Sequence, residues 1–154
     1  ERDQVLVPKS GDTLPGFDTP TFDNAYGVDP ICTQTPEPCP FHKLTLTDAL
    51  QLKVPVAYLI GTPAHCSTGT CAPALEQLTS VAKTVGDRAS FVHAEVYSDE
   101  AATVVAPAVK AFAMTFEPTL FIADANSKIV DRLDAVFDTQ EITEALSRAG
   151  VATS

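Results

Sequence analysis

Hydrophobic and polar positions follow a regular order from Leu44 onward, and this order predicts alternating strands and helices. Residues 54–60 form a compact apolar run, which is typical of a buried strand. Between residues 72 and 85, apolar positions recur at spacings of three and four, which places them on one face of a helix. Alternation returns at residues 89–96 and again at 119–123 and 128–133.

The full set of predicted elements has the order helix, strand, helix, strand, helix, strand, strand, helix. The elements are a short helix capped by Thr45 or Thr47 and ending near Leu52, a strand at 54–60, a helix at 72–85, a strand at 89–96, a helix at 100–112 with Pro107 as a kink, a hairpin of strands at 119–123 and 128–133, and a helix that begins at Asp138 or Thr139 and ends near Arg148. This order predicts an α/β fold, with a central mixed sheet, helices on both faces and an antiparallel hairpin at the end.

The first 44 residues have a different character. They hold seven of the twelve prolines, at positions 8, 15, 20, 30, 36, 38 and 40, which rules out long helices there. We therefore expect residues 1–44 to be a Pro-rich N-terminal extension packed on a domain formed by residues 45–154.

Composition and charge restrict the classes of partner. The 154 residues are 45% hydrophobic, enough for one well-packed core, and 20 acidic against 10 basic side chains give a net charge of −10. This charge repels a polyanion, so nucleic acid is excluded as a partner. No apolar run reaches the roughly 18 residues needed to span a bilayer, so this segment is not expected to insert into a membrane.

Four cysteines fall into two local pairs, Cys32/Cys39 and Cys66/Cys71. An even, locally paired set suggests disulfides and an oxidising compartment, and of three possible connectivities the local one is the simplest. Cys32–Cys39 is predicted to be a structural disulfide, because its Pro-rich loop offers no helix N-terminus to activate a thiol. Neither pair has the spacing of a zinc knuckle, and neither His42 nor His65 lies at a standard offset, so no metal and no cofactor are expected.

Cys66 and Cys71 lie where redox chemistry is favourable. Cys66 falls in the loop after the first long strand, and Cys71 falls at the start of the following helix, whose free N–H groups and dipole lower a thiol pKa. Gly69 supplies the bend that lets the two sulfurs meet. His65, beside Cys66, either stabilises the thiolate when protonated or accepts the thiol proton when neutral. The alternative is that His65 is an ordinary surface histidine of the loop.

Three stretches of the chain carry a family resemblance: GDTLPGFDTPTFD, KLTLTDALQLKVPVAYLIGTPAHC and FEPTLFIADANSKIVDRL. Together with the order of elements, they resemble the thioredoxin superfamily, and most closely its exported, membrane-tethered branch of thiol–disulfide oxidoreductases. The resemblance covers residues 10–149, in which residues 27–42 look like an insertion. It implies a protein outside the cytoplasm, either secreted or anchored in the cell envelope. The chain starts at Glu1 without a leader, so we interpret it as a mature or trimmed form that has lost its targeting segment.

The resemblance also implies residue roles. Cys66 would attack and Cys71 resolve, on protein thiols and disulfides or an envelope redox partner. Pro118 takes the place of the family's cis-proline, which exposes backbone for pairing with a substrate chain. Glu117 would face the cysteines, where a carboxylate raises a thiol pKa or accepts a proton; it is otherwise an exposed loop residue.

The cysteine motif departs from the family and leaves other functions open. Four residues separate Cys66 from Cys71 instead of two, the chain has no Trp, and Tyr58 stands where thioredoxins bury a carboxylate. One alternative is a non-catalytic binding or assembly domain in which Cys66–Cys71 is a structural disulfide. A second is copper handling, because related thioredoxin-like copper chaperones bind Cu(I) through two spaced cysteines and a distant histidine. Here the last histidine is His93, and no histidine follows it near the Pro118 loop or the hairpin. Peroxidase activity fits worst. Thioredoxin-fold peroxidases have a Thr three residues before the reactive cysteine, and Pro63 occupies that position before Cys66.

Overall fold

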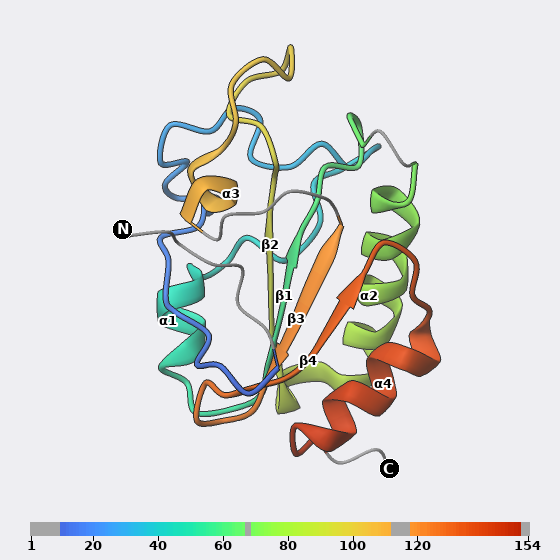
Figure 1. Cartoon of the computed structure of the whole chain (residues 1–154). Helices are drawn as coiled ribbons and strands as arrows, with labels where there is room; N and C mark the ends of the chain where they lie inside the picture. Colours follow the sequence, from blue (N-terminus) through green and yellow to red (C-terminus); the bar gives the residue numbers. More distant parts are fainter. Residues whose placement is uncertain (1–9, 67–68, 112–117, 152–154) are drawn as a thin grey trace, which may run out of the picture.

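The computed structural model describes residues 10–66, 69–111 and 118–151. Its elements are α1 (Leu46–Leu50), β1 (Val56–Ile60), α2 (Cys71–Val85), the 3-10 turn η1 (Gly86–Arg88), β2 (Ser90–Ala94), α3 (Pro107–Ala111), β3 (Thr119–Ala123), β4 (Ile129–Asp134) and α4 (Thr139–Arg148). The four strands form one sheet in the order β2-β1-β3-β4 (Figure 1). β1 and β2 run parallel, whereas β1–β3 and β3–β4 are antiparallel, which confirms the predicted α/β fold with a mixed sheet.

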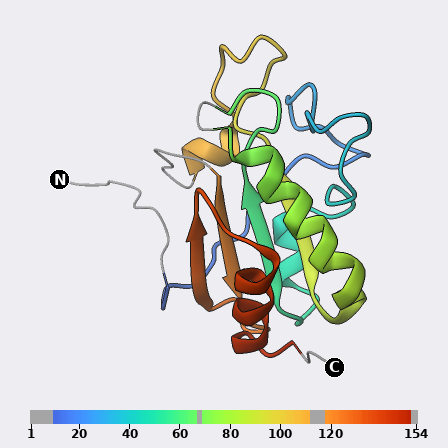
Figure 2. The same cartoon turned by 90° about the vertical axis from the view of Figure 1, so that its right-hand side faces the viewer.

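The alternation of side chains along β1 divides the core into two halves. Ala57 and Leu59 pack with α2 and α4 on one face, and Tyr58 and Ile60 pack with α1 and α3 on the other. Figure 2 shows α2 and α4 together in front of the sheet, with α1 behind it. Because both faces are covered, every residue of β1 and of β3 is buried, as continuous apolar runs predict.

The segment that follows β2 is less helical than the sequence predicted. The predicted helix at 100–112 is wrong in extent: α3 occupies Pro107–Ala111, and residue 112 lies outside the described residues. Before it, the Asp99 carboxylate accepts the N–H groups of Thr103 and Val104, which holds a tight turn. Pro107 begins the helix instead of kinking it, because a proline lacks only an N–H that the first turn does not use.

No helix within the described ranges has the length and apolar character needed to cross a membrane.

The N-terminal segment is packed against the sheet. Leu14, Val28 and Phe41 are buried, and the N–H of Gly11 donates to the carbonyl of Ile129 at 2.8 Å. At the opposite edge of the sheet, on β2, the N–H of His93 donates to the carbonyl of Phe41 at 3.1 Å. The segment that contains Cys32 and Cys39 therefore runs beside β2.

Candidate redox site and a buried cysteine–histidine cluster

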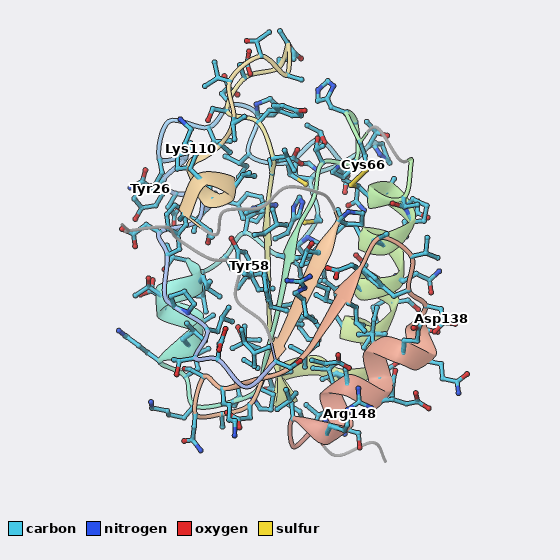
Figure 3. The ribbon with its side chains drawn as sticks, viewed as in Figure 1. Tyr26, Tyr58, Cys66, Lys110, Asp138 and Arg148 are labelled. Atoms are coloured by element: carbon cyan, nitrogen blue, oxygen red, sulfur yellow. A yellow bond between two sulfur atoms is a disulfide. The ribbon has the colours of Figure 1, made fainter. Side chains whose placement is uncertain are left out.

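Cys66 and Cys71 form a disulfide, with their Cα atoms 5.9 Å apart. β1 leads directly into the loop that carries Cys66, and Cys71 is the first residue of α2. Gly69 has a φ of +72° and its N–H donates to the carbonyl of Cys66 at 3.1 Å. This turn, for which glycine is suited, brings the two cysteines together across four intervening residues. Figure 3 shows the bond at the N-terminal end of α2, beside the label of Cys66.

The two cysteines differ in exposure. Cys66 is partly exposed, whereas only 1% of Cys71 is exposed. Cys66 is therefore the more accessible of the two cysteines to a thiol or disulfide in solution. The first turn of α2, all of whose residues are described, contains no acidic side chain, so no carboxylate of that turn opposes the positive end of the helix dipole.

Gly61 brings Pro118 close to this pair. A Cβ built on Gly61 would lie 3.3 Å from the Cys71 sulfur and 3.3 Å from the Cβ of Pro118. Pro118 therefore lies on the same side of Gly61 as Cys71, and its role as the family's cis-proline stays a prediction. Glu117 and its peptide bond to Pro118 lie outside the described residues, so the position of Glu117 stays a prediction. His65 is partly exposed and its ring contacts that of Tyr97 edge to face, with 6.2 Å between centroids.

A buried carboxylate is present, on a different strand from the one considered in the sequence. Tyr58 is fully buried on β1, whereas Glu95 directly follows β2 and is only 2% exposed. Glu95 accepts hydrogen bonds from the Thr33 N–H at 2.7 Å and from its hydroxyl at 3.0 Å. The same hydroxyl oxygen accepts the N–H of Ala64, which belongs to the loop before Cys66. Burial raises the pKa of the Glu95 carboxyl.

The second cysteine pair is part of a polar cluster. Cys32 and Cys39 are free and buried, so the predicted Cys32–Cys39 disulfide is not present in the structure. Their sulfurs instead face Nδ1 of His93, at 3.8 Å for Cys32 and 3.5 Å for Cys39. Nε2 of His42 lies 3.1 Å from the same nitrogen. The four side chains place one sulfur or nitrogen each within 4.8 Å of all the others.

The electrostatics of this cluster favour a single thiolate. The Cys39 thiol donates a hydrogen bond to the Cys32 sulfur, which holds the pKa of Cys32 far below its ordinary value and raises that of Cys39 far above it. Burial alone would lower the pKa of His93, but the Cys32 thiolate and then Glu95 outweigh it and raise that pKa. The cluster therefore places a Cys32 thiolate beside a His93 imidazole that favours its charged form.

Sequence reasoning missed this cluster because His93 is separated by 54 residues from Cys39 and by 51 from His42. The available signal was on β2, where His93 and Glu95 are polar residues two positions apart in an otherwise apolar stretch. Such a spacing places both side chains on one face of a strand.

The β1–α2–β2 unit, the antiparallel β3–β4 pair, the packing of α4 and the disulfide at the start of α2 together define a thioredoxin-like fold. No protein-family model and no curated protein sequence matches the chain. Solved structures do match. A thiol:disulfide interchange protein of the thioredoxin family from Chlorobium tepidum TLS aligns at a TM-score of 0.62 and 15% identity, over 93% of this chain and 97% of that one. MTB DsbF, solved in mixed oxidized and reduced forms, aligns at a TM-score of 0.57 and 16% identity, over 89% and 99%. At these identities the similarity is one of fold.

Proposed function

We propose that this protein is a thiol–disulfide oxidoreductase that acts outside the cytoplasm through Cys66 and Cys71. The observation that carries the proposal is the disulfide itself: it joins a partly exposed cysteine to a buried one at the N-terminus of α2, next to Pro118. The structural neighbours support it, since one is named a thiol:disulfide interchange protein. An oxidising compartment suits a disulfide partly open to solvent.

The proposed reaction starts from the reduced pair when the protein acts as a reductase. The Cys66 thiolate attacks a disulfide of a partner protein, so that a mixed disulfide forms and one partner thiolate leaves. The Cys71 thiolate then attacks the Cys66 sulfur, which forms the Cys66–Cys71 disulfide and releases the second partner thiolate. Two electrons pass to the partner, and the leaving thiolates take up protons according to their pKa values. The same steps in reverse oxidise a partner dithiol.

Other residues of the site have supporting roles in this proposal. The N-terminus of α2 stabilises the thiolate form of either cysteine. Pro118 and the preceding Glu117 provide the edge along which a partner chain would lie, as the resemblance implies. Protein thiols and disulfides, or an envelope redox partner, are therefore the proposed substrates.

A second candidate function is supported by the burial of Cys71. A cysteine residue that is 1% exposed, in a motif longer than that of thioredoxins, also suits a disulfide that only holds the loop to α2. In that case the fold would serve binding or assembly within a larger protein.

The two functions are separated by a trapping experiment. Cys71→Ser should leave Cys66 unable to resolve, so that mixed disulfides between Cys66 and partner proteins accumulate on non-reducing gels and vanish with dithiothreitol. Cys66→Ser/Cys71→Ser is the matched control and should trap nothing. If Cys71→Ser traps no more than this double variant, disulfide exchange through Cys66 is contradicted.

A further inference from the structure

The buried cluster of Cys32, Cys39, His42 and His93 has the geometry of a metal site. A zinc ion bonded at about 2.3 Å to sulfur and about 2.0–2.1 Å to nitrogen, with tetrahedral angles, requires sulfur–nitrogen separations of about 3.6 Å and a nitrogen–nitrogen separation of about 3.3 Å. In the protein the two sulfur–nitrogen distances to His93 are 3.5 and 3.8 Å, and the nitrogen–nitrogen distance is 3.1 Å. Three of the six separations between ligand atoms therefore already match a tetrahedral site, and all four ligand atoms lie within 4.8 Å of one another.

The two histidines are oriented by their outer nitrogens. Nε2 of His93 lies 2.8 Å from the carbonyl of Gly61, and Nδ1 of His42 lies 3.3 Å from the carbonyl of Pro20. A carbonyl only accepts, so each outer nitrogen carries the hydrogen. In neutral imidazoles the inner nitrogens then hold lone pairs that point at each other over 3.1 Å. A hydrogen on Nδ1 of His93 or a metal ion can lie between these two nitrogens, and a metal ion takes both lone pairs as ligands. Carbonyl bonds of this kind commonly orient the histidines that bind metal ions.

We propose that the protein binds one structural Zn²⁺ ion through four side chains: Cys32, Cys39, His42 and His93. Two thiolates balance the charge of the ion, and two neutral imidazoles complete a tetrahedral set of two sulfurs and two nitrogens, which indicates zinc among the transition metals. All four residues are buried, Cys32 being 7% exposed and the other three fully enclosed. With four protein ligands and no access for water, the site is closed and has no position for catalysis.

The site has a clear place in the fold. Three of its ligands come from the segment before α1 and the fourth from β2. The ion thus fastens a proline-rich segment, which lacks regular structure, to the sheet. It also adjoins the redox pair, because the same Gly61 whose carbonyl binds His93 packs against the Cys71 sulfur. Its existence does not depend on the proposed redox function.

Metal analysis of the purified chain tests the proposal. Protein produced with zinc in the medium and purified without chelators should contain close to one zinc per chain by mass spectrometry of the elements. Cys66→Ser/Cys71→Ser is the matched control: it also removes two cysteines, but it should keep the full zinc content. Cys32→Ser/Cys39→Ser should lose the zinc. Equal zinc in both double variants, or a Cys32–Cys39 disulfide in the isolated wild-type chain, would overturn the proposal.

A second measurement covers the case in which Cys32→Ser/Cys39→Ser does not fold. The wild-type chain, freed of metal by a chelator under reducing conditions, is titrated with Co²⁺ and then with Zn²⁺. We expect intense visible bands of tetrahedral cobalt and a thiolate-to-cobalt absorption in the near ultraviolet, both abolished by one equivalent of Zn²⁺. Weak octahedral bands, or a chain that takes up Cu(I) but no Zn²⁺, would contradict a zinc site.

Discussion

At the scale of single residues, Tyr58 shows how burial in β1 affects a titratable group. Its side chain is fully enclosed, packs near Phe121, and has a pKa raised by burial from its ordinary value of 10.0. The folded chain therefore keeps the phenol protonated at a pH at which the unfolded chain has lost the proton. By linkage, stability is complete below pH 10 and falls as the pH rises above it.

This linkage gives a prediction for Tyr58→Phe. Between pH 9.5 and 11 the wild-type free energy of unfolding should fall more steeply than that of the variant, by up to about 1.4 kcal/mol per pH unit. Urea unfolding at several pH values measures both slopes, and the other titrating groups are common to the two proteins. Identical slopes would show that Tyr58 ionises as readily in the folded as in the unfolded chain.

Residue-level prediction from sequence succeeded for neighbours and failed for distant partners. The pairing of Cys66 with Cys71 was predicted correctly, because Gly69 lies between them and allows the bend that closes the disulfide. The Cys32–Cys39 disulfide was predicted from the same closeness in sequence, but both sulfurs instead contact His93. His93 lies beside them only because the N-terminal segment packs along β2, which the local sequence does not show.

At the scale of elements, α4 is the helix whose start is most clearly determined by neighbouring residues in the sequence. The Asp138 carboxylate accepts the N–H of Glu141 at 2.8 Å, and the Glu141 carboxylate accepts the N–H of Asp138 at 3.1 Å. This reciprocal capping box fixes the start of the helix and makes Asp138, one of the two predicted candidates, its N-cap. α3 was overpredicted because Asp99 and Pro107 act through a turn and a helix start that apolar spacing does not reveal.

Asp138→Ala should lower the free energy of unfolding by about 0.5–2 kcal/mol, because the first turn of α4 loses an acceptor for its free N–H groups. Asp138→Asn, which keeps an oxygen acceptor, should retain most of the stability. Chemical unfolding of both variants tests this, and an equal loss in both would assign the effect to the charge of Asp138 and not to its hydrogen bond.

At the scale of the whole molecule, the sheet and its helices follow from periodicity, whereas residues 10–44 do not. Strands and helices from Val56 onward bury one or both faces at regular intervals, so their order predicted the mixed sheet and helices on both sides. The N-terminal segment has no period; its place is set by backbone bonds to Ile129 and His93 and by the Cys–His cluster. These contacts are long-range, so a local pattern could not reveal them.

The reduction potential of the Cys66–Cys71 disulfide tests the central claim most directly. The protein is equilibrated with defined thiol buffers, and thiol labels on the two cysteines are read by peptide mass. We predict a potential between about −100 and −270 mV, the range of known exchange catalysts. A potential below about −300 mV would mark a disulfide that resists cellular reductants, contradict the oxidoreductase and favour a structural role.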